Sequence, residues 1–431
     1  MLQHAVTVVG LLLATPVLAF HCALVAKTEG YQSQYSVNVS IGTPSQTFDL
    51  IIDTGSSDLW VQGTDCTQCY VGPKFNSSQS STFVPGCARG SCDNTLAYGS
   101  GVSTARVGQD RIALNGVPLV DLVQFGVVYS EDASITNVLQ NSGILGLGFS
   151  AMSFFTHPSP VEYISDFALY LDGTNKSVLS VNQVLDKYAG PHVAWSTIPV
   201  EELEGLYTYW TVGLPEATFG STQLCGSTKN RCQAVLDSGT GFIAIPPQLW
   251  IAVLGELQQA GCIMLNRGGP FECMSMASLP TFQLVLGTLQ GYKVTIEPSM
   301  YAFPVEGAST VLVGLIESPL NLWILGSLFL QYYYTRFDIA KKQVQMISLV
   351  EAPKELVPVP IAAADQPSYF DQIYDETYME HLMVLFIVGA SAFMIYTLLF
   401  RQPQRSKYEH GYVPDDVLLA KLLSDQPPRR R

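Results

Sequence analysis

One short pattern occurs twice in this chain, and it constrains the fold more than any other feature. An apolar run ends in an aspartate that is followed by a hydroxyl residue, a glycine and a second hydroxyl residue, at Asp53–Ser56 and again at Asp237–Thr240. The two aspartates lie 184 positions apart. Each half then carries an Ile-Leu-Gly element, at Ile144–Gly146 and at Ile324–Gly326. Because order and spacing are nearly the same, the sequence predicts two similar lobes.

Composition favours β-structure in these lobes. The chain has 431 residues, of which 48% are hydrophobic, so it can bury a sizeable core in more than one lobe. Glycine (35), proline (25) and tyrosine (21) are abundant, while only 13% of residues are charged, which is typical of strands joined by turns. Tyr35–Ile41 and Thr47–Ile52 read as strands.

Helices are expected to be few and short. Pro247–Gln259 is the clearest, because Trp250, Val253, Leu254 and Leu257 share one face after an early proline. Further short helices are expected within residues 158–171 and 329–334.

The charge distribution excludes nucleic-acid binding through the net field. The formal net charge is −14, and residues 401–431 hold seven Lys or Arg against four Asp or Glu, so the acidic excess lies in the first 400 residues.

Two apolar segments predict passage through the secretory pathway and a membrane anchor. Residues 1–19 resemble a signal peptide, with retention as an N-terminal anchor as the alternative. Residues 382–400 are 19 uncharged residues, about 28 Å as a helix, which is close to the thickness of a bilayer core. Basic residues follow this run and acidic residues precede it. The sequence therefore predicts a single-pass type I membrane protein with a luminal or extracellular body, at the plasma membrane or in an endolysosomal or vacuolar compartment.

The predicted anchor divides the chain into segments. Residues 20–34 form a short N-terminal segment, 35–190 the N-terminal lobe and 191–350 the C-terminal lobe. A Pro-rich acidic stalk is expected at 351–381, and a cytoplasmic tail at 401–431.

Nine cysteines fit an oxidising compartment. Cys225–Cys232 and Cys262–Cys273 are predicted as local disulfides. Cys66, Cys69, Cys87 and Cys92 allow three pairings, which the sequence leaves open, and Cys22 is left over. The Cys-x-x-Cys spacing at Cys66 has no second pair and no nearby histidine, so no metal is expected. Asn38, Asn76 and Asn175 begin triplets that accept N-linked glycans.

The duplicated aspartates suggest acid–base chemistry. Two carboxyl groups held together cannot both ionise freely, so the pair keeps one proton at acidic pH. One member then donates a proton to a substrate carbonyl, and the other activates a water for attack on the amide carbon. Gly55 and Gly239 allow backbone amides to approach the carboxyl groups, and Ser56 and Thr240 supply hydroxyl groups. Thr54 and Ser238 are expected to tie the two loops together.

Longer strings extend this pattern to a family. They are FDLIIDTGSSDLWV at Phe48–Val61, YGSG at Tyr98–Gly101, GILGLG at Gly143–Gly148, VLDSGTGFIAIP at Val235–Pro246 and WILGSLFLQYYYTRFD at Trp323–Asp338. With these strings the chain resembles the pepsin-like aspartic proteases from about Tyr35 to Val350. The resemblance implies an all-β, bilobal fold with a few short helices, to which the chain adds a C-terminal transmembrane helix. It also implies an aspartic endopeptidase without a cofactor, acting as a monomer on protein or peptide substrates.

The resemblance assigns roles to individual residues. Asp53 and Asp237 match the catalytic pair, Trp60 matches the residue that supports the flap, and Tyr209 matches a tyrosine near the cleft. The flap tip, a hairpin that closes over substrate, is matched by Tyr98, Gly99, Ser100 and Gly101. The resemblance supports the Cys225–Cys232 disulfide. The usual partner of Cys66 lies five residues on, where this chain has Val71.

The chain departs from the family before its first strand. Family zymogens carry a basic prosegment of about forty residues, whereas only residues 20–34 lie between the predicted signal peptide and that strand, with Lys27 as their single basic residue. We therefore expect control by pH or localisation.

Two other functions compete with an active protease. A catalytically silent peptide-binding membrane receptor on the same scaffold is the main alternative, although both aspartates and their neighbouring glycines are intact. A serine or metallo hydrolase lacks its motifs here, since the sequence has no Gly-x-Ser-x-Gly and no His-Glu-x-x-His.

Overall fold

The structure is a computed structural model. It describes residues 19–29, 32–86, 93–119, 122–155, 159–189, 194–226, 232–265, 268–305, 307–349 and 356–360. β-strands make up most of the regular secondary structure of these residues and the helices are few and short, which confirms the predicted all-β class. Within these ranges no helix is long and apolar enough to cross a membrane. The predicted span at 382–400 and residues 1–18 of the predicted signal peptide lie outside the described residues.

The N-terminal half of the chain forms one large sheet. Nine of its strands follow one another through hydrogen bonds, in the order β10 (Val117–Pro118), β9 (Ile112–Leu114), β3 (Gln32–Ile41), β4 (Gln46–Asp53), β12 (Gly143–Gly146), β5 (Leu59–Gln62), β11 (Val123–Glu131), β8 (Gly101–Asp110) and β6 (Val84–Pro85). Two further strands pair at its side, β2 (Val25–Glu29) with β3 and β7 (Asp93–Tyr98) with β8.

The C-terminal half forms three smaller sheets. The first orders β16 (Thr211–Leu214), β19 (Cys232–Leu236), β28 (Trp323–Leu325), β20 (Ile243–Ile245) and β27 (Leu315–Glu317). The second orders β18 (Thr222–Cys225), β17 (Glu216–Phe219), β23 (Phe282–Leu286), β24 (Gln290–Ile296) and β31 (Val357–Pro360). The third orders β21 (Cys262–Met264), β22 (Phe271–Cys273), β26 (Val311–Val313) and β25 (Ala302–Pro304).

The duplication seen in the sequence is also a duplication of strand pairing. In the N-terminal half β4 runs parallel to β12, β12 pairs antiparallel with β5, and β5 runs parallel to β11. In the C-terminal half β19, β28, β20 and β27 repeat the same three relations. The strands next to each aspartate are buried on both faces, which explains their continuous apolar sequences.

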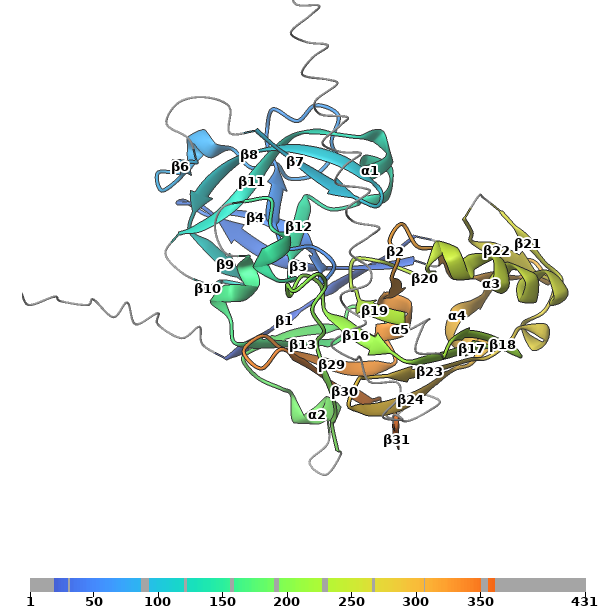
Figure 1. The fold of residues 1–431 in the computed structure, drawn as a ribbon. Helices are drawn as coiled ribbons and strands as arrows, with labels where there is room; N and C mark the ends of the chain where they lie inside the picture. Colours follow the sequence, from blue (N-terminus) through green and yellow to red (C-terminus); the bar gives the residue numbers. More distant parts are fainter. Residues whose placement is uncertain are drawn as a thin grey trace, which may run out of the picture. The chain divides into compact units, whose positions relative to one another are not determined.

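A six-stranded sheet contains strands from both halves of the chain. Its order is β1 (Phe20–Ala23), β14 (Val178–Val181), β13 (Asp166–Tyr170), β29 (Tyr333–Asp338), β30 (Gln343–Ser348) and β15 (Ser196–Pro199). Blue β1, green β13 and orange β29 therefore lie together in Figure 1, although they are far apart in the sequence.

The N-terminal segment at 20–34 is part of this folded body. β1 pairs with β14 and β2 pairs with β3, and the side chains of Cys22 and Leu24 are buried in the main core. The folded body thus begins near Phe20, earlier than the lobe boundary expected at residue 35.

Helix α3 (Pro247–Gln259) has the predicted bounds and buries Trp250, Val253 and Leu257. The helix predicted within residues 158–171 is wrong. The described part of that segment holds one 3-10 turn, η3 (Pro160–Tyr163), and then β13, because pairing with β14 and β29 favours an extended backbone. Besides α5, which is introduced below, the other helical elements of the described residues are α1 (Ala133–Val138), α2 (Asp186–Ala189), α4 (Pro298–Tyr301), η1 (Ser77–Gln79), η2 (Ser150–Met152) and η4 (Met276–Ser278).

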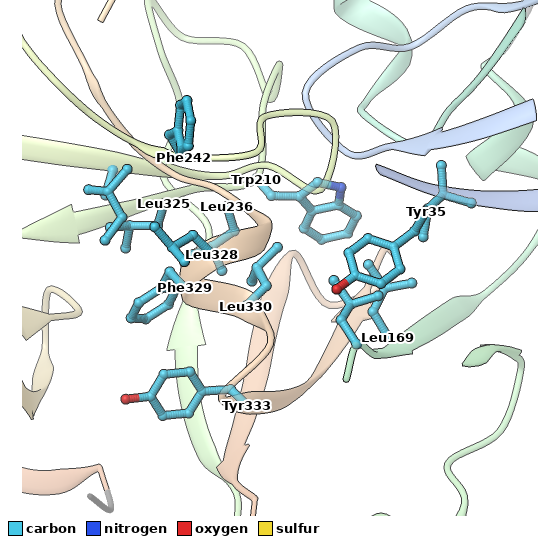
Figure 2. Packing of buried hydrophobic residues seen from close by; sticks show 14 of the residues in the cluster. Tyr35, Leu169, Trp210, Leu236, Phe242, Leu325, Leu328, Phe329, Leu330 and Tyr333 are labelled. Carbon is cyan, nitrogen blue, oxygen red and sulfur yellow. The ribbon is translucent and has the colours of Figure 1, made fainter. Parts of the chain in front are cut away.

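Helix α5 (Ser327–Leu330) and the turn at residues 331–332 supply the helical turn expected within 329–334, and β29 begins at Tyr333. The side chains of α5 belong to the main core. Figure 2 shows Leu328, Phe329 and Leu330 with Trp210 and with Tyr35 of β3 in this cluster.

The predicted stalk also contains a strand. β31 pairs antiparallel with β24, so the folded body extends at least to Pro360. The rest of the expected stalk, residues 351–355 and 361–381, lies outside the described residues.

Three disulfides are present in the described residues. They join Cys225 to Cys232, Cys262 to Cys273 and Cys66 to Cys69. Cys22 is a buried free thiol. Cys87 and Cys92, whose pairing the sequence left open, lie outside the described residues.

Candidate active site

The two duplicated loops meet through their aspartates. Asp53 is the last residue of β4, and Asp237 directly follows β19. Their exposed fractions are 7% and 8%, so both carboxyl groups are almost completely buried.

Thr54 and Ser238 join the loops through four reciprocal hydrogen bonds. The Thr54 hydroxyl donates to the Leu236 carbonyl (2.8 Å) and accepts from the Ser238 N–H (2.9 Å). The Ser238 hydroxyl donates to the Ile52 carbonyl (2.8 Å) and accepts from the Thr54 N–H (3.1 Å). All four bonds are buried and connect the two halves of the chain, so both loops are held in a single arrangement.

Each carboxyl group accepts the same two hydrogen bonds within its own loop. Asp53 accepts from the Gly55 N–H (2.9 Å) and from the Ser56 hydroxyl (2.5 Å). Asp237 accepts from the Gly239 N–H (2.8 Å) and from the Thr240 hydroxyl (2.6 Å). Donors placed in this way favour the ionised form of a carboxyl group.

The two glycines are required because each lies against the opposite carboxyl group. A Cβ on Gly55 would lie 2.6 Å from Cγ of Asp237, and a Cβ on Gly239 would lie 2.3 Å from Oδ1 of Asp53. No real Cβ contact is that short. The two carboxyl groups therefore face each other across a space that a methyl group would fill.

Burial and repulsion act against ionisation of the pair. Burial, followed by the charge of Asp237, raises the pKa of Asp53 well above its ordinary value. The hydrogen bonds from Ser56 and Gly55 lower the same pKa and offset part of this rise.

The glycines of the Ile-Leu-Gly elements pack behind these loops. A Cβ on Gly146 would lie 2.5 Å from the Asp58 nitrogen, and one on Gly326 would lie 2.2 Å from the Phe242 carbonyl oxygen. Close packing of backbone explains why glycine is needed at both places.

A hairpin of β7 and β8 carries the predicted flap residues. Tyr98 pairs with Gly101 at its end, and Gly99 and Ser100 are exposed. The Trp60 indole N–H donates to the Tyr98 hydroxyl (2.7 Å). Burial, followed by the charges of Asp53 and Asp58, raises the pKa of Tyr98.

Tyr209 is the second tyrosine that the sequence predicts near the pair. Its side chain is half-buried, and burial followed by the charges of Asp237 and Asp53 raises its pKa. The neighbouring Trp210 is fully buried and donates its indole N–H to the Leu147 carbonyl (2.8 Å). The charges of both aspartates thus act on Tyr209, and the charge of Asp53 acts on Tyr98.

Asp58 is a third buried carboxyl group near this site. The sequence pattern assigns it no role. It accepts from the Ser153 hydroxyl (2.5 Å) and from the Phe154 N–H (3.0 Å), and burial raises its pKa. Asp58 lies five residues after Asp53, but its donors come from a loop nearly a hundred residues away, so no local pattern reveals this environment.

The three candidate glycosylation sites lie in different surroundings. Asn38 is half-buried within β3, between β4 and β9. Asn76 is half-buried, and its carboxamide oxygen caps η1. Asn175 is exposed in the turn between β13 and β14. Among the described residues, no cluster of three or more His, Cys, Asp or Glu forms a metal site.

Two β-rich halves that each supply one buried carboxyl group define the architecture of an aspartic peptidase. Residues 34–349 match the eukaryotic aspartyl protease family. The chain is 32% identical to cathepsin D of Dictyostelium discoideum, over 74% of this chain and 84% of the relative. It is 30% identical to rabbit (Oryctolagus cuniculus) gastricsin, over 73% and 81%. It is 28% identical to chicken (Gallus gallus) pepsin A, over 78% and 91%.

The chain therefore belongs to the eukaryotic aspartyl protease family. This confirms the pepsin-like resemblance and the prediction that the protein is an aspartic-type endopeptidase.

Proposed function

We propose that Asp53 and Asp237 are the catalytic pair and hydrolyse peptide bonds through an activated water. The observation that carries this proposal is the symmetry of the site. Two buried carboxyl groups face each other, and each accepts one glycine N–H and one hydroxyl from its own loop.

The reaction uses one proton held by the pair. The protonated carboxyl group donates to the substrate carbonyl oxygen, while the ionised one accepts a proton from a water molecule that attacks the carbonyl carbon. The tetrahedral intermediate collapses when the C–N bond breaks: the leaving nitrogen takes a proton from one carboxyl group, and a hydroxyl group of the intermediate returns a proton to the other, which restores the singly protonated pair. No covalent adduct with the enzyme forms, and no cofactor takes part.

The surrounding residues position this chemistry. Ser56 and Thr240 hold the outer carboxylate oxygens, and Thr54 and Ser238 keep the two loops at a constant separation. Tyr98, at the end of the β7–β8 hairpin, closes over the substrate with its hydroxyl held by Trp60. Tyr209 covers the opposite side. Because one chain supplies both aspartates, the enzyme acts as a monomer.

We expect an acidic pH optimum. Burial and then the charge of Asp237 raise the pKa of Asp53 to about 8, which keeps the pair singly protonated throughout the acidic range. The hydroxyl donors Ser56 and Thr240 favour ionisation of one carboxyl group of the pair, so this range begins at low pH. A profile of kcat/KM against pH checks this, and a maximum above neutral pH would contradict it.

Substitution of either aspartate tests the pair. Asp53→Asn or Asp237→Asn keeps the shape of the side chain but removes the titrating carboxyl group, so we expect peptide hydrolysis to fall by at least about a thousandfold while the circular-dichroism spectrum is unchanged. Asp49→Asn is the matched control, because Asp49 lies on the same strand, β4, with an exposed side chain.

Full activity in either pair variant would refute the assignment. An inactive wild-type enzyme that still binds a transition-state-mimic inhibitor would instead support the peptide-binding receptor considered above.

The location of the enzyme is a further part of the proposal. We infer that residues 1–19 direct the chain into the secretory pathway, that residues 382–400 anchor it, and that the catalytic body faces the lumen or the exterior, joined to a cytoplasmic tail at 401–431. Of the three glycosylation candidates, exposed Asn175 is the best placed to carry a glycan. A glycosidase-sensitive mobility shift that Asn175→Gln removes is expected, and release of the protein from membranes by alkaline carbonate would contradict the anchor.

A further inference from the structure

The N-cap residue of α1, the helix Ala133–Val138, has an unusual hydrogen-bond partner. Asp132 is the N-cap of α1, yet its side chain makes no hydrogen bond with that helix. Its carboxylate instead accepts the N–H of Val102 (2.9 Å), and its own N–H donates to the Val102 carbonyl (2.9 Å). Val102 is the second residue of β8. It pairs across the hairpin with Ala97, the residue before Tyr98. Asp132 thus bonds both backbone groups of Val102.

The hairpin also packs directly against the start of α1. Gly101 has a φ of +143°, which glycine adopts readily. A Cβ there would lie 2.5 Å from the Ser134 hydroxyl oxygen and 3.3 Å from Cβ of Asp132. Only glycine lets β8 approach this closely, so the turn end of the hairpin is in contact with the first turn of α1.

Helix α1 is itself firmly held. Ile135 and Leu139 are buried in a small core cluster that also contains Trp60 and the Cys66–Cys69 disulfide. The Thr136 hydroxyl donates to the Gln68 carbonyl (3.1 Å), which ties α1 to the loop that this disulfide closes. The first turn of α1 therefore offers a rigid support for the hairpin.

We propose that Asp132 is a positioning residue for the flap, because its carboxylate holds Val102 and thereby sets the position of Tyr98 over the aspartate pair. This inference rests on the proposed function, in which the β7–β8 hairpin closes over substrate. Asp132 touches neither substrate nor reacting atoms, and it acts through the backbone of β8. Without this bond the hairpin spends less time closed.

Three variants isolate the hydrogen bond. Asp132→Ala removes the acceptor. Asp132→Ser keeps a good helix cap, but its hydroxyl ends one bond short of the Oδ2 position. Asp132→Asn retains a carboxamide oxygen in the same place and removes only the charge. Asp49→Ala, on β4, is the control for loss of an exposed aspartate in the same half of the chain.

The first measurement is amide hydrogen exchange of the peptides that cover residues 98–103. We expect faster exchange there in Asp132→Ala and Asp132→Ser, and wild-type exchange in Asp132→Asn and Asp49→Ala, with melting temperatures unchanged throughout. This measurement needs no catalysis, so it decides the inference even if the assignment of the aspartate pair fails.

The second measurement is steady-state hydrolysis of a peptide substrate. A binding-competent flap that is populated less often raises the apparent dissociation constant and leaves turnover at saturation intact. We expect KM to rise about fivefold in Asp132→Ala and Asp132→Ser, the equivalent of one hydrogen bond, with kcat nearly unchanged. Unchanged exchange in both, or an equal defect in Asp132→Asn, overturns the proposal.

Discussion

Each carboxyl group of the proposed catalytic pair is surrounded by residues from two distant parts of the chain. Its hydrogen-bond donors come from its own loop, whereas the glycine that leaves room for it comes from the other loop. The Asp-hydroxyl-Gly pattern therefore serves two purposes at the same position. Gly55 and Gly239 donate their N–H groups locally and also allow the carboxyl groups to approach across the two halves of the chain.

This double requirement predicts the effect of a single methyl group. In Gly239→Ala the new Cβ would lie 2.3 Å from Oδ1 of Asp53, so the two loops must separate. We expect kcat to fall by about a hundredfold, because a displacement of roughly an ångström at reacting groups has an effect of that size. Steady-state hydrolysis of a peptide substrate measures it.

The matched control is Gly255→Ala in helix α3, where a Cβ meets nothing within 4 Å. We expect unchanged activity and a gain of about 0.5–1 kcal/mol in the free energy of unfolding, because alanine favours helix. Wild-type kcat in Gly239→Ala would show that the loops tolerate separation.

At the scale of elements, local pattern was enough where an element depends on its own residues. Helix α3 combines an early proline with apolar residues on one face, and its bounds are those predicted. The segment 158–171 has apolar residues that also fit a helix. In the structure, however, β13 of this segment pairs with β14 and β29. The Asp166 carboxylate also forms an ion pair with the Arg336 guanidinium (2.5 Å). These partners lie elsewhere in the chain, so the local pattern could not reveal them.

The N-terminal segment shows the same limit and leads to a second prediction. Leu24 is 1% exposed, and its N–H donates to the Ser177 carbonyl (2.8 Å). If this segment remains in the mature enzyme, Leu24→Ala leaves a cavity and lowers the free energy of unfolding by about 2–5 kcal/mol. Denaturant unfolding of the purified mature protein measures the change.

Leu289→Ala is the control, since Leu289 is 69% exposed, and we expect a change within about 0.5 kcal/mol. Equal stability of the two variants would mean that processing removes residues 20–34, as in a conventional zymogen.

At the scale of the whole molecule, several buried carboxyl groups couple stability to pH. Burial is the largest cause that raises the pKa of Asp53, Asp58 and Glu131. In the folded state these groups bind protons more tightly than in the unfolded state. Their contribution to stability is therefore complete below about pH 4, the usual pKa of the unfolded side chains, and is lost as pH rises through the raised values.

We therefore expect the enzyme to be more stable at pH 4 than at pH 7, by about 1.4 kcal/mol for each unit of pKa difference. Asp53→Asn should reduce this dependence, because an amide does not titrate. Thermal unfolding of both proteins at a series of pH values measures it. Stability that increases toward pH 7, or an identical slope in the variant, would contradict the interpretation.

The sequence by itself determined that the chain has two related halves, that each contributes one aspartate followed by glycine and hydroxyl residues, and that the class is all-β with few helices. These properties are repeated or periodic along the chain, so they can be recognised without knowing which residues meet. Only the tertiary structure decided that each glycine makes room for the opposite carboxyl group, that residues 20–29 and 357–360 complete sheets of the body, and that Asp132 bonds the hairpin rather than its own helix. Each of these depends on contacts between distant segments, whose energies arise only when the chain has folded.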